Sequence, residues 1–205
     1  MYRYIKRVLD FVLSAIGLIL LSPLFLIIVI AVKVDSKGPV FFKQKRVGIH
    51  KNHFNILKFR TMRTDTPKDM PTHMLADPTK FITRTGNILR KTSLDELPQL
   101  INILKGDMSI IGPRPALWNQ YDLIEERDRY GANDVLPGLT GWAQINGRDE
   151  LEIPVKARLD GEYVEKMSFL FDIKCFFGTI VSVLKHDGVV EGGTGEIHKR
   201  ENSER

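Results

Sequence analysis

The sequence predicts an α+β protein in which mixed helices surround a short β-hairpin and an apolar segment stands at the amino terminus. Three observations over the 205 residues indicate this fold class. Residues 11–32 contain no charged side chain. Two short stretches rich in β-prone residues flank a turn before residue 60. Most of the later segments have the apolar spacing of amphipathic helices.

The composition limits the possible classes of protein. The chain is 43% hydrophobic and carries 30 Lys and Arg against 25 Asp and Glu, a net charge of +5. That excess suits a nucleic acid, an anionic membrane surface or a phosphorylated substrate. Cys175 is the only cysteine, so no internal disulfide forms, which fits a reducing compartment.

The apolar segment from Phe11 to Val32 is long enough to cross a bilayer, because roughly 22 residues at ~1.5 Å each span about 33 Å. Ser22-Pro23 interrupts it, and a proline at that place kinks or breaks a helix. Basic residues stand on both sides of the segment: Arg3, Lys6 and Arg7 before it, and Lys33, Lys37, Lys43, Lys45 and Arg46 after it. Since basic flanks favour the cytoplasmic side, we expect one re-entrant membrane helix broken at Ser22-Pro23. A single spanning helix is the alternative.

The rest of the chain divides into a hairpin followed by helices. Residues 38–48 and 53–62 predict two strands around a turn, and 83–106 predict a helix in two parts that ends at Gly106. Helices are also expected over 115–130 and 150–165, with a glycine-rich block at 135–148 between them that forms either a functional loop or a turn–strand–turn. We divide the chain into a re-entrant membrane helix at 1–36, a cytoplasmic catalytic domain at 37–187 and a flexible tail at 188–205.

Residues 170–185 form a strongly apolar segment with two interpretations. A core helix needs no further explanation. An amphipathic interface helix would place Phe176, Phe177 and Ile180 among lipid headgroups, with Asp172 and Lys174 facing water.

The acidic pair Asp95-Glu96 stands where a helix should begin. Ser93 with Glu96 three residues later matches a capping box, which explains the pair without any chemistry. Pro98 fits that register poorly. If Asp95 is itself the N-cap, Pro98 falls within the first turn, where proline is tolerated. Taken alone, the pattern favours a cap over a catalytic site.

The surroundings of the pair favour phosphate or metal chemistry instead. Two adjacent carboxylates disfavour each other's ionisation unless a cation lies nearby. Arg90 stands one turn upstream, and Arg114 lies between two prolines, where its guanidinium fork suits phosphate. Mg²⁺ is commonly held by one or two carboxylates together with substrate phosphates.

These blocks, taken in order, resemble the monotopic phosphoglycosyl transferases, a family of bacterial sugar transferases, in the minimal form without extra membrane helices. The matching features follow the basic amino terminus and the break at Ser22-Pro23. They are Lys58–Met62, Arg90, Ser93–Gln99, Lys105–Ser109, Gly112–Pro115, Pro137–Gly141, Trp142–Arg148, Asp160, Tyr163 and Asp172.

The resemblance implies a two-step reaction at the cytoplasmic face of the bacterial inner membrane. Asp95 would attack the sugar-bearing phosphate of a UDP-sugar and release UMP, and a polyprenol phosphate, such as undecaprenyl phosphate, would then take the phosphosugar from Asp95. Glu96, with Asp95, would hold Mg²⁺. The product would begin the synthesis of a capsule, exopolysaccharide or glycan. The implied substrate-binding residues are Arg90, Arg114, Lys58, Arg60, Arg148 and Asp160.

Three other functions are weighed against this one. A nucleic-acid binder is disfavoured, because the cations are scattered among carboxylates and no binding motif is present. A membrane-anchored scaffold leaves Asp95-Glu96 and Arg114 unexplained. A Mg²⁺-dependent phosphohydrolase is the nearest enzymatic alternative. A homodimer is left open.

Overall fold

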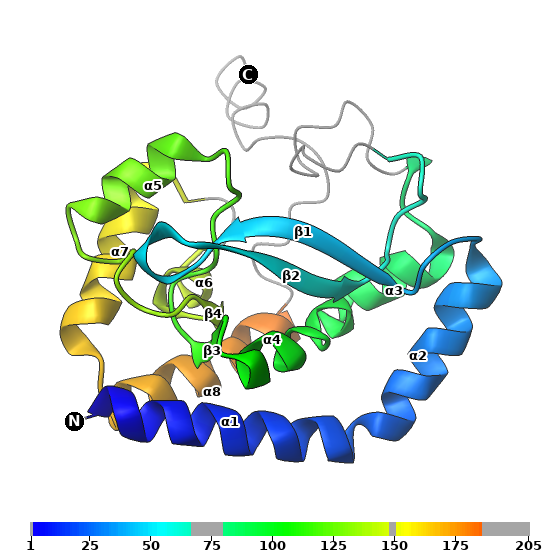
Figure 1. Ribbon diagram of the computed structural model, residues 1–205, viewed down its shortest axis with the longest axis horizontal. Coiled ribbons are helices and arrows are strands. Elements are labelled where there is room, and N and C mark those ends of the chain that lie inside the picture. The colour runs from blue at the N-terminus through cyan, green and yellow to red at the C-terminus, as the bar shows by residue number, and fades with distance from the viewer. Residues whose placement is uncertain (1, 67–79, 148–150, 186–205) are drawn as a thin grey trace.

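The computed structural model describes residues 2–66, 80–147 and 151–185, and confirms a mixed α+β fold (Figure 1). The predicted tail at 188–205 lies outside these residues. Two helices, α1 (Tyr2–Leu20) and α2 (Ser22–Asp35), precede the hairpin of β1 (Phe41–Val47) and β2 (His53–Phe59). The remaining elements are η1 (Ile49–Lys51), α3 (Arg84–Lys91), η4 (Leu94–Glu96), α4 (Gln99–Lys105), β3 (Ser109–Ile111), α5 (Tyr121–Asp128), β4 (Gly138–Thr140), α6 (Trp142–Ile145), α7 (Ile153–Lys166) and α8 (Phe169–Lys185).

The amino-terminal segment is bent at the predicted place. α1 and α2 meet at Leu21, and their axes differ by 63°. The Ser22 hydroxyl donates to the carbonyl of Ile19 at 2.7 Å, and Pro23 lies in the first turn of α2, where a missing N–H costs nothing. Within the described residues no single helix has the length and apolar composition of a membrane span, whereas the bent pair together does.

The hairpin forms as predicted, with β1 and β2 antiparallel and Phe42 opposite Lys58. A second, parallel pair of short strands, β3 and β4, was not predicted. β4 lies in the glycine-rich block, where the absence of side chains lets its backbone approach the segment after β3 closely. A Cβ on Gly138 would lie 2.2 Å from the backbone nitrogen of Gly112, so no side chain fits there.

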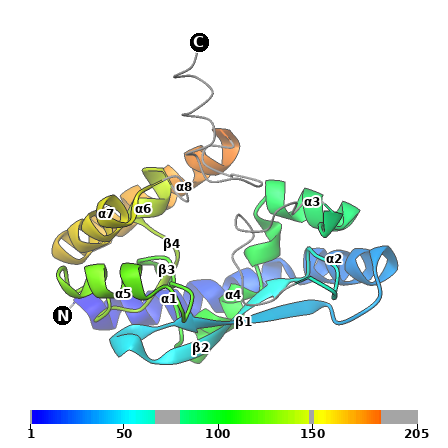
Figure 2. The ribbon, with the colours of Figure 1, turned by 90° about the horizontal axis from the view of Figure 1, so that it is seen from above.

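Helices α5 and α7 pack side by side at one end of the molecule, as Figures 1 and 2 both show. A buried ion pair joins them: Arg127 donates from Nε and Nη2 to one carboxylate oxygen of Asp160, at 2.8 and 2.6 Å. Both side chains are almost fully buried. This pair explains why Asp160 lies on the inner face of α7.

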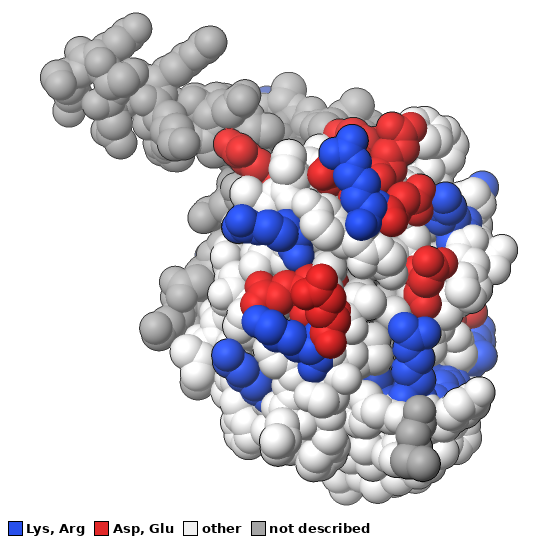
Figure 3. Space-filling view, turned by 90° about the vertical axis from the view of Figure 1, so that its left-hand side faces the viewer, with Lys and Arg blue, Asp and Glu red and all other residues white. Residues whose placement is uncertain are grey.

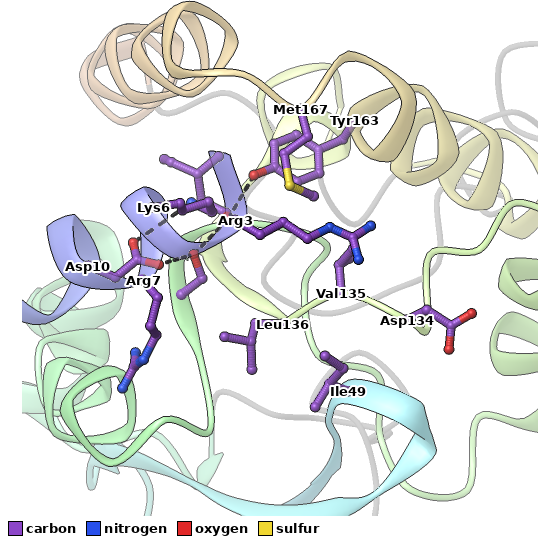
Figure 4. Close-up of a pocket in the computed structure, with 12 residues that line it drawn as sticks. Arg3, Lys6, Arg7, Asp10, Ile49, Asp134, Val135, Leu136, Tyr163 and Met167 are labelled. Carbon is purple, nitrogen blue, oxygen red and sulfur yellow. Dashed lines mark hydrogen bonds and ion pairs between the residues drawn. The ribbon is translucent and has the colours of Figure 1, made fainter. Parts of the chain in front are cut away.

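Helix α1 is attached to the rest of the fold through polar contacts near its amino terminus (Figure 4). The Lys6 ammonium lies 2.8 Å from Asp172 of α8 and 3.7 Å from Asp10. Asp10 in turn accepts from the Ser109 hydroxyl and the backbone N–H of Ile110. Because Lys6 and Asp10 are buried, the first half of α1 packs closely against β3 and α8.

One side of α1, α2 and α8 is apolar and exposed. α8 combines features of both sequence interpretations, since Cys175 is buried on one face while large apolar side chains are exposed on the other. Asp172 does not face water as the interface interpretation expected, because it is buried and accepts from Lys6 and Tyr163. In Figure 1, α1 and α8 lie along the lower side of the molecule. The exposed apolar residues include Ile5, Val8, Phe11, Leu13, Ile16, Ile19, Leu26, Ile27, Ile30, Val34, Phe169, Leu170, Phe176, Phe177 and Ile180.

The buried pair of Arg127 and Asp160 predicts a large loss of stability when one partner is removed. Asp160→Asn leaves the Arg127 guanidinium buried without a counter-charge, which should lower the free energy of unfolding by about 3 kcal/mol. Denaturant unfolding in detergent measures this value. The control is Asp65→Asn, which breaks an exposed pair with Arg63 and should cost less than about 1 kcal/mol. Equal stability of the two variants would contradict the prediction.

Candidate active site

The acidic pair lies in a short 3-10 turn between two helices. Ser93 ends α3 in a left-handed conformation, with φ +56°, and its side chain makes no capping hydrogen bond. α4 begins only at Gln99, with Pro98 as its N-cap. The capping box does not form, because Ser93 stands at the N-cap of η4 without a side-chain hydrogen bond. Asp95 is not an N-cap, because it lies inside η4, and Leu97 and Pro98 separate the pair from α4. Asp95 and Glu96 occupy the η4 turn instead of the first turn of a long helix.

Two cations hold Glu96 in place. Its Oε1 atom accepts from the Lys58 ammonium at 2.6 Å and from the Arg114 Nη2 at 2.9 Å. Lys58 comes from β2, and Arg114 comes from the segment after β3. Burial works against ionisation of Glu96, but Arg114 and Lys58 outweigh it and hold its pKa well below the usual range. Glu96 is therefore ionised, and its carboxylate binds both Lys58 and Arg114.

Asp95 is buried beside this cluster and is less firmly paired. Its Oδ2 lies 3.9 Å from the Lys58 ammonium, a distance too long for a hydrogen bond. Burial raises the pKa of the Asp95 carboxyl, and the charge of Glu96 adds to the rise. The cations of Lys58, Arg90 and Arg114 oppose that rise. The Asp95 carboxyl group therefore lies next to several cations, and its pair with Lys58 is too long for a hydrogen bond.

Five of the predicted site residues meet at this place. They come from β2, α3, η4 and the segment after β3, and they are Lys58, Arg90, Asp95, Glu96 and Arg114. Carboxylate and cation charges alternate within the group. Such a site can receive phosphate oxygens on its cations while a carboxylate lies within reach of the phosphorus.

Two predicted substrate-binding residues lie elsewhere. The guanidinium of Arg60 is buried against backbone carbonyls near the end of α2. Asp160 is engaged by Arg127 between α5 and α7. Arg148 lies outside the described residues.

The donor set around Glu96 fits a Mg²⁺ ion only if a substrate supplies further oxygens. Among the described residues, no three His, Cys, Asp or Glu side chains gather as a metal site. Mg²⁺ is commonly bound by one or two carboxylates together with phosphates and water. Asp95 and Glu96 are adjacent within η4, so they supply the one or two carboxylates that such a Mg²⁺ site needs.

Sequence reasoning missed the residues that connect the site to the amino-terminal helices. Leu94 and Leu97, on either side of the acidic pair, pack against a buried cluster that Ile28 and Val32 of α2 share with Phe59 and Leu89. The two leucines that flank the acidic pair indicate that one side of this stretch is buried, but they do not identify the residues against which it packs.

Two surface features lie outside the group formed by Lys58, Arg90, Asp95, Glu96 and Arg114, which we call the acidic cluster. A cavity of about 130 Å³ lies at the amino terminus of α1, and Figure 4 shows Arg3 extending into it between Tyr163 and Val135. Its lining includes no residue of the acidic cluster. On the face shown in Figure 3, acidic and basic side chains are interspersed, without the continuous basic stripe expected of a nucleic-acid binder.

Comparison with known proteins identifies the family. The sequence profile of the bacterial sugar transferases matches residues 1–186. An uncharacterized sugar transferase, EpsL, of Bacillus subtilis is 40% identical over 185 residues, which are 90% of this chain and 90% of that protein. The UDP-glucose:undecaprenyl-phosphate glucose-1-phosphate transferase of Escherichia coli is 42% identical over 186 residues, 87% of this chain and 40% of that protein.

A third relative is an N-acetylgalactosaminephosphotransferase of Aeromonas hydrophila that acts between UDP-N-acetylgalactosamine and undecaprenyl phosphate. It is 37% identical over 191 residues, 89% of this chain and 44% of that protein. The chain therefore spans less than half of these two longer relatives and nearly all of EpsL. With the profile matched from the first residue to the end of α8, the chain belongs to the bacterial sugar transferase family.

Proposed function

We propose that this protein transfers a sugar-1-phosphate from a UDP-sugar to a membrane polyprenol phosphate, giving a polyprenyl diphosphate sugar and UMP. The observation that carries the proposal is the buried Asp95 carboxylate beside a Glu96 that Lys58 and Arg114 hold. Relatives whose names state undecaprenyl phosphate as acceptor support the same reaction class. Their names differ in the sugar, so the sugar is not assigned.

The chemistry divides into two displacements at one phosphorus atom. A carboxylate oxygen of Asp95 attacks the phosphorus that bears the sugar, and the bond from that phosphorus to the bridging oxygen breaks, so that UMP leaves with the oxygen. A phosphate oxygen of the polyprenol phosphate then attacks the same phosphorus and restores the Asp95 carboxylate. Dividing one difficult transfer in this way makes each step easier.

The charges of the cluster suit both displacements. Phosphoryl transfer depends mainly on positioning and on stabilising charge on the phosphate oxygens. Arg90 and Arg114 would receive those oxygens, while Glu96, which accepts from Lys58 and Arg114, would keep these two cations oriented. Mg²⁺ held by Asp95 and Glu96 would supply further positive charge at the phosphates.

The lipid acceptor requires the site to stand at a membrane surface. The apolar exposed faces of α1, α2 and α8 support a monotopic attachment to the cytoplasmic membrane, with the bent pair re-entrant and the catalytic residues on the cytoplasmic side. Both basic flanks then remain in the cytoplasm.

Asp95→Asn should abolish UMP release from a UDP-sugar, because an amide cannot serve as the nucleophile. The expected fall is at least about 10³-fold. Screening UDP-sugars with purified protein and polyprenol phosphate first identifies the substrate, and UMP release is then measured for each variant. Asp134→Asn, which changes an exposed carboxylate, serves as control. An active Asp95→Asn together with an inactive Glu96→Gln would show that the nucleophile is assigned to the wrong residue.

Lys58→Met should move the acidic limb of the pH–rate profile to higher pH. Asp95 must be ionised to attack, and its pKa is raised by burial but opposed by Lys58. Without that cation the Asp95 pKa rises further, so activity is lost at a higher pH as the solution is acidified. Lys58→Arg keeps the charge and should keep the limb near its original position. A limb that stays unmoved in Lys58→Met would argue against Asp95 as the titrating group.

The re-entrant arrangement predicts that both ends of the α1–α2 pair lie in the cytoplasm. Single cysteines introduced at residue 2 and at residue 37, in a Cys175→Ser background, should be labelled only after a membrane-permeant reagent is used. Labelling of residue 2 by an impermeant reagent added outside the cell would indicate a spanning helix.

A further inference from the structure

The carboxyl end of α2 is held by a buried guanidinium. Arg60, which follows β2, donates to the carbonyls of Lys37, Ser36 and Val32 at 2.7, 2.7 and 3.2 Å. It is 5% exposed. These carbonyls belong to the last turn of α2 and the residues after it, so Arg60 satisfies groups that a helix leaves free at its end.

The chain makes room for this contact at Gly38. A Cβ on Gly38 would lie 2.1 Å from the Arg60 Nη1, and its φ of +127° is a conformation that side chains avoid. Only glycine therefore lets the loop after α2 close around the guanidinium.

A second link runs from α2 to α3. The Asp35 Oδ2, at the last residue of α2, accepts from the backbone N–H of Thr85 in the first turn of α3, at 2.8 Å. α3 carries Arg90, and Lys58 stands two residues before Arg60 on β2. The end of α2 is thus attached to two of the three segments that bring cations to the acidic pair, and the third, which carries Arg114, is not part of these links.

Apolar packing completes the connection. Ile28 and Val32 of α2 form one buried cluster with Phe59 and Leu89, and Leu94 and Leu97 pack against it. The outer face of α2 is exposed and apolar at Leu26, Ile27, Ile30 and Val34. The inner face of α2 therefore belongs to the apolar cluster that supports the acidic turn, and its outer face is exposed and apolar.

We propose that Arg60 and Asp35 are positioning residues that fix the acidic pair at a set depth relative to α2, so that the phosphate of a membrane-embedded acceptor reaches Asp95. This inference rests on the proposed function and concerns only its second step. The donor nucleotide arrives from water and needs no fixed depth. The ion pairs that hold Glu96 come from Lys58 and Arg114 and do not involve α2, so the donor step should survive when the links are broken.

The test measures the two steps separately. The donor step is the single-turnover release of UMP without acceptor. The acceptor step is the kcat/KM for polyprenol phosphate in phospholipid vesicles. Arg60→Met and Asp35→Ala should lower the second value by about 10- to 100-fold, since small misplacements of reacting groups have effects of that size. The first value should stay within about twofold of wild type.

Three controls sharpen the result. Asp35→Asn retains an oxygen that can accept from Thr85 and should restore the acceptor step. Arg63→Gln breaks an exposed pair in the same segment and should change neither step. With a short-chain, water-soluble prenyl phosphate as acceptor, the variants and wild type should react at similar rates, because no membrane depth is involved.

The outcomes are distinct. An equal fall in both steps, or a defect that persists with the soluble acceptor, would overturn the proposal, and so would unchanged kinetics of both variants. If Arg60→Met does not fold, as judged by circular dichroism, Asp35→Ala with its Asp35→Asn partner decides alone. Failure of wild type to release UMP from any UDP-sugar would instead reject the proposed function.

Discussion

The site depends on one carboxylate oxygen, the Oε1 of Glu96, which accepts from Lys58 and Arg114 at once. These two cations come from segments 56 residues apart in sequence (58 and 114), and the acidic turn lies between them along the chain. Lys58 brings the hairpin to the turn, and Arg114 brings the segment after β3. Without Glu96, two partly buried cations would face each other with only Asp95 between them, at high electrostatic cost. Glu96 thus assembles the site and leaves the neighbouring Asp95 without a close partner.

The same turn is joined to the helices that carry the exposed apolar face. Leu94 and Leu97 pack on an apolar cluster that includes Ile28 and Val32 of α2, and the end of α2 is held by Arg60 and Asp35. The amino-terminal half of α1 is bound to α8 and β3 through Lys6 and Asp10. A reaction between a water-soluble donor and a lipid acceptor needs a rigid relation between active site and membrane. Under the proposed function, these buried polar contacts would supply that relation.

Much of this could be predicted from sequence because it depends on local signals. Ser22-Pro23 marked the bend, β-prone residues marked the hairpin, and Gly106 marked the end of α4. The β3–β4 pair was missed because a three-residue parallel strand has no periodicity to detect, and its close approach at Gly112 and Gly138 is a tertiary requirement. The capping box was expected from residue types and spacing alone, but Ser93 adopts a left-handed conformation at the start of η4 and makes no side-chain cap, which the spacing does not reveal. Arg60 and Asp160 were assigned to substrate by the family resemblance, and a motif match does not show that the fold surrounds Arg60 with carbonyls and pairs Asp160 with Arg127.

The central claim is that Asp95, kept free by the Glu96 cluster, carries the phosphosugar between the two substrates. Intact-protein mass spectrometry after mixing with the identified UDP-sugar, without acceptor, tests it most directly. The account predicts an added mass of one phosphosugar that maps to Asp95 and disappears when polyprenol phosphate is supplied. An adduct on Glu96, or product formation with no adduct at any time during rapid acid quenching, would contradict it.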